Sequence, residues 1–200
     1  MFDLYQPIAY TALIFLCLII SFYYRKKDAS KLFLYFLLVV IVESLTNIFN
    51  VKTNSIYSIG TFGYMIFFTF YYSKHLVNRK KQIYIFGGIS CIVGLSLIMI
   101  SDDIFPIGLG ICIAVFYIFL SLAWFFYQTK DSDSIFIVQK QAFWVSVALL
   151  FWSIIFLFRV VPMYWLEKND LNFLLILSEI FKTAVVVTYV FFLVAVTRKH

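Results

Sequence analysis

Four ionisable side chains lie within long apolar runs of this 200-residue chain. They are two acids and two bases: Glu43, Arg159, Glu179 and Lys182. A charge at the centre of a bilayer costs about 3 kcal/mol on insertion scales, so such groups usually pair with one another or mark a pathway or a binding site. The formal charges of these four cancel, which would allow them to lie together in a low-dielectric interior.

Helical spacing places these charges beside other polar groups. Glu179 and Lys182 are three residues apart and therefore share one side of a helix. Glu43 and Asn47 are four residues apart and share a side for the same reason. We expect one polar cluster that also includes Arg159, and we take these five residues as candidate ligand-binding residues. The alternative is structural, because polar side chains can hold helices together in a membrane and Glu179 with Lys182 can form a local pair.

The composition indicates that membrane-spanning helices carry these residues. Hydrophobic residues make up 64% of the chain and charged residues 13%, whereas a soluble domain carries about a quarter charged residues. The apolar residues come in unbroken runs near the ~20 residues that a helix needs to cross a bilayer. A transmembrane barrel would instead alternate apolar and polar residues over about ten positions.

Seven such runs are present, and they predict one all-α domain over residues 1–200, a bundle of seven transmembrane helices. The predicted spans are about 5–24, 32–50, 55–73, 82–100, 104–127, 142–165 and 171–196. The third is the least apolar, because serine, threonine and glycine dilute its first half. The N-terminal MFDLYQP has no basic region, and RKK follows the first run, so we expect this helix to be retained rather than cleaved as a signal peptide.

The basic residues predict the orientation of the bundle. With seven spans the loops alternate between the two sides of the membrane, and the positive-inside rule makes the basic side cytoplasmic. The N-terminus then lies outside and the C-terminus inside. The predicted cytoplasmic set is Arg25, Lys26, Lys27, Lys31, Lys74, Arg79, Lys80, Lys81, Lys130, Lys140, Arg198 and Lys199, against Lys52 and Lys168 outside. At a rise of about 1.5 Å per residue, the four intramembrane charges lie about 9–16 Å from the outer ends of their helices, in the outer half.

Two similarities raise the question of an internal repeat. YMIFFTFYYSKH (64–75) and YVFFLVAVTRKH (189–200) end alike, and Pro-Ile stands near the start of both the first and the fifth runs. A duplication would relate residues 1–75 to residues 106–200 around a single middle helix, as in transporters that are built from repeats. Phe-rich helices also resemble one another by chance, so both explanations stay open.

The sequence offers no set of residues for catalysis or for metal binding. His75 and His200 lie at the predicted cytoplasmic ends of spans, far from the charged residues. Cys17, Cys91 and Cys112 fall inside spans, without the spacing of a metal site or of a disulfide framework. We therefore expect a protein that is not an enzyme and that has no catalytic residue, no metal and no other cofactor.

Lys182 resembles the lysine in the seventh helix of microbial rhodopsins. It lies in the seventh predicted span, and the predicted N-terminus is outside, as in that family. In that family the lysine holds retinal and an acid stands one turn before it; here Glu179 stands three residues before Lys182. RVVPMYW (159–165) is loosely similar to the family's pocket of aromatic residues and proline. The third predicted span departs from the family, because it has no charged residue between Ser55 and Ser73. The resemblance implies a retinal-type chromophore on Lys182 as an alternative function.

The function classes that remain are non-enzymatic. We expect a small ligand to be bound, either for transport or for sensing on behalf of a partner. An alternative is an accessory or effector protein of a bacterial defence system, which would act through partner association or membrane permeabilisation. A composition rich in Phe, Ile and Lys is typical of AT-rich bacterial genomes, which predicts a multi-pass protein of the cell inner membrane. The expected partners are the lipid bilayer and either another protein or a second copy of the chain; the basic residues mark topology and predict no nucleic-acid partner.

Overall fold

The computed structural model describes residues 2–24, 31–49, 53–100, 107–130, 136–163 and 170–198, and the elements within these ranges are helices. The α-helices are α1 (Phe2–Tyr24), α2 (Leu32–Phe49), α3 (Thr53–His75), α4 (Lys80–Ile100), α5 (Ile107–Gln128), α6 (Gln141–Val160) and α8 (Leu171–Thr197). Two short 3-10 helices, η1 (Val77–Arg79) and η2 (Ile137–Gln139), come before α4 and α6. The predicted all-α fold class is therefore confirmed.

The α-helices coincide with the predicted apolar runs to within a few residues at most ends. The end predicted for the sixth run is wrong: α6 stops at Val160 and the chain turns at Val161 and Pro162, not at residue 165. Proline explains the stop, because it has no N–H to donate and its ring collides with the carbonyl group one turn earlier. Residues 104–106, at the predicted start of the fifth run, lie outside the described residues.

Four stretches of the described chain are long and apolar enough to cross a membrane. They are Val77–Ile100, Ile107–Gln128, Gln141–Val160 and Leu171–Thr197; Ala9–Tyr24 and Leu32–Thr46 are shorter apolar helices. Large hydrophobic side chains also lie on the outside of the bundle, as on α4, where Ile92 is 66% exposed and Met99 is 87% exposed. Such a surface fits a membrane protein, in which lipid covers the outer side chains.

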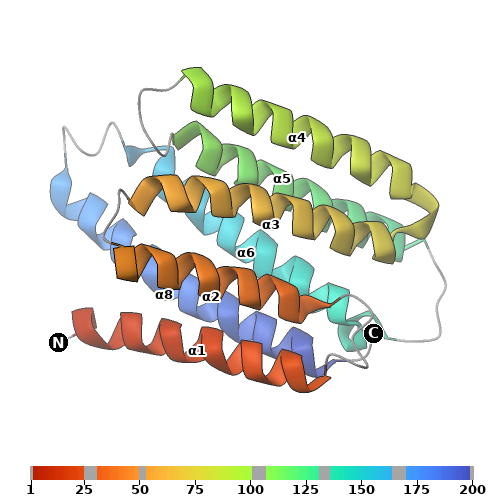
Figure 1. Cartoon of the computed structure of the whole chain (residues 1–200), viewed down its shortest axis with the longest axis horizontal. Coiled ribbons are helices and arrows are strands. Elements are labelled where there is room, and N and C mark those ends of the chain that lie inside the picture. Colours follow the sequence, from red (N-terminus) through yellow and green to blue (C-terminus); the bar gives the residue numbers. More distant parts are fainter. Residues whose placement is uncertain are drawn as a thin grey trace.

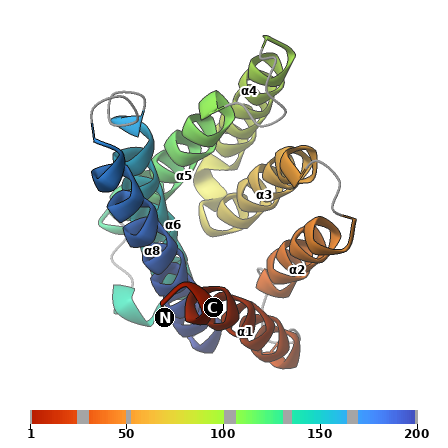
Figure 2. The ribbon, with the colours of Figure 1, turned by 90° about the vertical axis from the view of Figure 1, so that its left-hand side faces the viewer.

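Six of the α-helices in the described part of the chain form a closed ring. Around it, α1 contacts α2, α2 contacts α3, α3 contacts α5, α5 contacts α6, α6 contacts α8, and α8 returns to α1. The remaining helix, α4, packs outside the ring against α3 and α5, and Figure 2 shows it at the edge of the bundle. Successive helices run in opposite directions along the long axis (Figure 1). The first three and the last three α-helices thus enclose a space that α4 does not reach.

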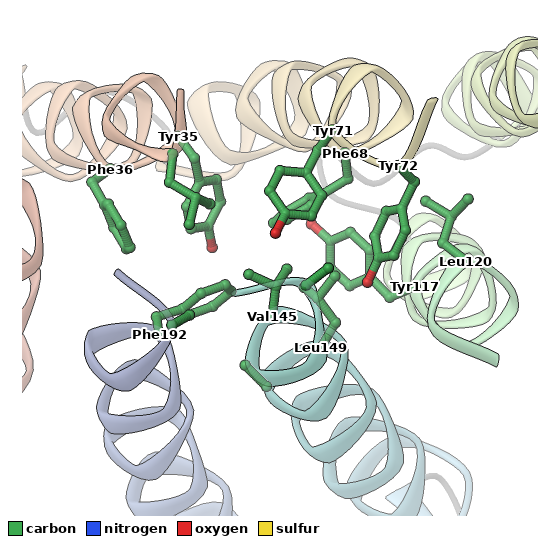
Figure 3. Packing of buried hydrophobic residues seen from close by; sticks show 14 of the residues in the cluster. Tyr35, Phe36, Phe68, Tyr71, Tyr72, Tyr117, Leu120, Val145, Leu149 and Phe192 are labelled. Carbon is green, nitrogen blue, oxygen red and sulfur yellow. The ribbon is translucent and has the colours of Figure 1, made fainter. Parts of the chain in front are cut away.

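An aromatic core lies inside the ring, and Figure 3 shows side chains that converge from α2, α3, α5, α6 and α8. Tyr35 and Phe68 have ring centroids 4.9 Å apart. Tyr117 lies 5.2 Å from Phe68, and Phe192 lies 5.3 Å from Tyr35. Ring pairs at such distances contribute about 0.5–1.5 kcal/mol each beyond their burial, so this core sets the spacing of the helices around it.

A polar layer of Tyr71, Tyr72, Ser121, Gln141 and Ser146 crosses the interior near the end of α3 and the start of α6. The Tyr72 hydroxyl lies 2.8 Å from Ser146 Oγ and 3.3 Å from Ser121 Oγ, which ties α3 to α6 and α5. Tyr71 donates to Gln141 Oε1 at 3.3 Å. All five side chains are buried, and they come from α3, α5 and α6.

Replacing Tyr72 by phenylalanine should lower the stability of the bundle. The change removes the hydroxyl group that both serines contact, and interhelical hydrogen bonds in membrane proteins contribute about 0.6 kcal/mol each. The midpoint of thermal unfolding in lipid nanodiscs should fall by about 2–4 °C. The control is Tyr23→Phe, which should leave the midpoint unchanged because Tyr23 is 81% exposed. Equal shifts in both variants would contradict the role that we give to the Tyr72 hydroxyl.

Candidate ligand-binding cavity

A cavity of about 370 Å³ lies inside the helical ring. All six ring helices line it, whereas α4 does not. This volume lies at the lower end of the range for small-molecule pockets, which is about 300–1,000 Å³. The walls are largely aromatic and include Tyr10, Tyr35, Tyr57, Tyr64, Tyr117, Trp152, Phe156, Phe181, Tyr189 and Phe192.

The cavity lies toward the end of the bundle that carries the N-terminus. It is lined by Tyr57 near the start of α3, by Gly110 near the start of α5 and by Phe156 near the end of α6. These helix ends lie at the left of Figure 1, on the same side as the N-terminus. The buried polar layer lies nearer the opposite end of the bundle, between α3, α5 and α6.

Glu43 is the one charged residue that lines the cavity within the described ranges. Tyr10 donates to its Oε1 at 2.8 Å, and Tyr57 donates to its Oε2 at 3.2 Å. These tyrosines come from α1 and α3, the two ring neighbours of α2. Burial of a carboxylate costs far less when its oxygens accept hydrogen bonds. The hydrogen bonds from the two tyrosines therefore explain how a carboxylate can be accommodated at this position.

The two threonines of the cavity wall direct their hydroxyl groups to their own helices. Thr61 Oγ1 donates to the carbonyl oxygen of Tyr57 at 2.8 Å, and Thr188 Oγ1 donates to that of Ala184 at 2.8 Å. Such bonds to the preceding turn are usual for threonine in membrane helices. A ligand in this cavity would therefore meet aromatic rings and the carboxylate of Glu43.

Glu179 and Lys182, the centre of the predicted cluster, pair with each other outside the cavity. Lys182 Nζ donates to Glu179 Oε1 at 2.5 Å, and the lysine and glutamate side chains are 51% and 42% exposed. The cavity face of α8 carries Phe181, Val185 and Thr188. Glu179 comes two residues before Phe181, which corresponds to a rotation of about 200° around the helix. Glu179 therefore lies on the side of α8 that faces away from the cavity. The two charges thus compensate each other on the outer surface of α8.

Arg159 contacts the cavity wall without lining the cavity. It lies in the last turn of α6, with its guanidinium carbon 5.0 Å from the ring centroid of Phe181. This is a cation–π contact, and a positive charge is also favourable at the C-terminal end of a helix. Asn47 belongs to α2, one turn beyond Glu43, but its side chain lies outside the described residues.

The structure therefore does not bring the predicted residues together as one cluster. Of the predicted side chains that it describes, Glu179 and Lys182 contact each other, and Glu43 alone lines the cavity. A sequence gives the position of each charged residue along its helix and around it, but it does not show which helix packs against that side. Lys182, to which the retinal-type alternative assigns the chromophore, is not among the residues that line this cavity.

Sequence analysis does not identify Tyr64 and Tyr117 as residues of the cavity. Both lie well inside their helices, away from the helix ends at which tyrosine is common in membrane proteins. A tyrosine hydroxyl at that depth needs a hydrogen-bond partner or a polar space. Position within a span is therefore the signal by which these residues could be found from sequence.

Comparison with protein-family models, with curated proteins and with solved structures finds no match to this chain. Among the residues that the structure describes, no three of His, Cys, Asp and Glu are grouped so that they could hold a metal ion. One fold can host many functions, so the chemistry of the cavity is the basis on which function can be inferred.

Proposed function

We propose that this chain is a seven-span protein of the bacterial cell inner membrane that binds a small ligand in the cavity from the outer side. The observation that supports this most directly is the cavity of about 370 Å³, which all six ring helices line and which contains the Glu43 carboxylate. Spaces between the helices of a bundle are common ligand sites. Ionisable groups inside membrane bundles usually serve such a site or a pathway.

The orientation that we propose places the N-terminus outside and the C-terminus in the cytoplasm. Lys74 lies in the last turn of α3, Lys80 begins α4 and Lys130 follows α5, so these lysines belong to the end of the bundle opposite the cavity. The positive-inside rule favours the cytoplasm for that end. The cavity then lies in the outer half of the membrane, and the polar layer lies in the inner half.

Two roles fit this arrangement, namely transport of the ligand and sensing of the ligand for a partner. Buried side chains of the polar layer lie between the cavity and the proposed cytoplasmic end on the side of α3, α5 and α6, which favours binding without passage in this conformation. Transport would require the Tyr72 hydroxyl to leave Ser121 and Ser146. Sensing would require a membrane or cytoplasmic partner, or a second copy of the chain, to receive the signal.

The accessibility of the cavity to water can be tested with one thiol. In a background in which Cys17, Cys91 and Cys112 are replaced by alanine, Thr61→Cys places a thiol in the cavity wall. We expect this thiol to react with the neutral reagent methyl methanethiosulfonate in nanodiscs, because the reactive thiolate forms where water reaches it. In intact spheroplasts it should also react with a membrane-impermeant reagent added outside.

The matched control is Ile59→Cys in the same background. Ile59 lies two residues earlier on α3, at nearly the same depth, and is 74% exposed on the outside of the bundle. Its thiol should react about tenfold more slowly, because lipid would surround it and disfavour the thiolate. Equal rates at both positions, or no reaction of Thr61→Cys, would contradict a water-accessible cavity. Reaction from the cytoplasmic side alone would reverse the orientation.

A further inference from the structure

Glu43 presents its carboxylate group to the cavity, and no basic side chain of the described residues lines the cavity beside it. Its two oxygens accept hydrogen bonds from Tyr10 and Tyr57, and no lysine, arginine or histidine lines the cavity in the part of the chain that the structure describes. Hydrogen bonds from phenols reduce the cost of burying a carboxylate, but they leave its charge in place. The cavity is therefore electrostatically suited to a positively charged ligand.

The aromatic walls around Glu43 favour the same sign of charge. The face of an aromatic ring is negative and attracts a cation within about 6 Å of the ring centroid. Tyr35, Tyr64 and Tyr189 line the cavity together with Trp152, the residue type that forms the strongest contacts of this kind. Aromatic cages are a recurrent means of recognising alkylated ammonium groups.

The cavity is less suited to a metal ion. Calcium takes about six to eight oxygen ligands, often from several carboxylates, and magnesium needs a near-octahedral set. Glu43 is the one carboxylate of the described cavity wall, and Thr61 and Thr188 direct their hydroxyl groups to backbone oxygens. An organic cation can instead fill the space with apolar groups and place its charge beside Glu43.

We propose that the cavity binds a monovalent organic ammonium ion, with Glu43 as its counter-ion and the aromatic side chains as its cage. Tyr10 and Tyr57 act as positioning residues, because their hydroxyl groups hold the two carboxylate oxygens. This assignment rests on the proposed function, since it needs a cavity that a ligand enters from the outer side. It adds the sign of the ligand's charge and its chemical class.

The sign of the charge can be measured with the Thr61→Cys variant in the cysteine-free background. Two methanethiosulfonates are compared, one with a trimethylammonium group and one with a sulfonate group, and each rate is divided by the rate for a small thiol in water. The normalised rate should favour the ammonium reagent by about tenfold or more, because a negative cleft concentrates cations. Glu43→Gln should abolish most of this preference.

The matched control is the double variant Glu179→Gln with Lys182→Met. It removes a carboxylate at a similar depth but outside the cavity, and it leaves the net charge of the chain unchanged. The preference for the ammonium reagent should persist in this variant. Loss of the preference here as well would show that Glu43 is not its source.

A second measurement leaves Glu43 unchanged and does not depend on the folding of Glu43→Gln. Choline or its uncharged isostere 3,3-dimethylbutan-1-ol is added while methyl methanethiosulfonate reacts with Thr61→Cys. Choline at ten times its dissociation constant should slow the reaction by about tenfold, and the isostere should not. The nanodiscs contain phosphatidylglycerol, which has no ammonium group. Protection that requires added phosphatidylcholine would assign the ammonium ion to a lipid headgroup.

The outcomes separate this assignment from the proposed function. Equal normalised rates, a preference for the sulfonate reagent, or equal protection by choline and its isostere would overturn the ammonium assignment and leave the cavity in place. No reaction of Thr61→Cys with any of the reagents would instead remove the water-accessible cavity on which the assignment rests.

Discussion

Lys182→Met should destabilise the protein in lipid nanodiscs by about 2–3 kcal/mol, which corresponds to a fall in the unfolding midpoint of roughly 4–12 °C. In the wild type, Lys182 and Glu179 compensate each other on the outer surface of α8. Without the lysine, a single carboxylate remains about 12 Å from the start of the helix, where lipid would surround it. The carboxylate must then be left unpaired or take up a proton, and either change costs free energy.

Glu179→Gln in combination with Lys182→Met should return the midpoint to near the wild-type value. The two side chains bond to each other within one helix and are half exposed, and ion pairs at this spacing contribute only about 0.2–0.5 kcal/mol. The control is Lys80→Met, which removes an exposed lysine at the start of α4 and should change the midpoint little. A double variant as unstable as Lys182→Met would show that the pair holds helices together.

Gly87→Ala should destabilise the bundle by about 1–3 kcal/mol, although alanine is the better helix former. A Cβ atom at this position in α4 would collide with Thr69 Oγ1 of α3 and lie 2.7 Å from Thr69 Cγ2. Thr69 cannot turn away without loss of a hydrogen bond, because its hydroxyl donates to the carbonyl oxygen of Met65 at 2.8 Å. Either Thr69 turns and loses this hydrogen bond or the helices α3 and α4 separate, and both changes should lower the midpoint of thermal unfolding in nanodiscs.

The neighbouring residue provides the control for Gly87. A Cβ atom at Gly88 would meet nothing within 4 Å, so Gly88→Ala should be neutral or stabilising by up to about 1 kcal/mol. Thr69→Ala should rescue Gly87→Ala, because it removes both of the atoms nearest to the new methyl group. Equal effects of alanine at positions 87 and 88 would contradict the close packing of α3 against α4.

The bounds of the helices could be predicted closely because the features that form a helix lie within one segment of the sequence. The predicted run 171–196 became α8 over Leu171–Thr197, since a long apolar segment between polar connections has few alternatives to a helix. The wrongly predicted end of α6 also has a local cause, because Pro162, which stops the helix, can be read from the sequence. The duplication of residues 1–75 and 106–200 stays a prediction, although α1 to α3 and α5, α6 and α8 of the described chain make up the ring.

The candidate site could be predicted only in part, because it is formed by contacts between side chains of different helices. Glu43 was found from the cost of a charge in an apolar run, and the structure places it in the cavity wall. Its partner Tyr10 lies 33 residues away in sequence and on another helix. The exposure of Glu179 and Lys182 depends on how α8 is rotated toward α1 and α6. No spacing within a single helix reports that rotation.

The sequence by itself determined that the chain folds as long apolar helices and how far its charged residues lie from the helix ends, because run length and rise per residue are properties of one helix. The tertiary structure decided which side chains share a space. The ring of helices places tyrosines from α1 and α3 on the carboxylate of α2 and leaves the ion pair of α8 outside. The reason is physical: burial is a property of the packed bundle, since side chains from all six ring helices together form the walls of the cavity.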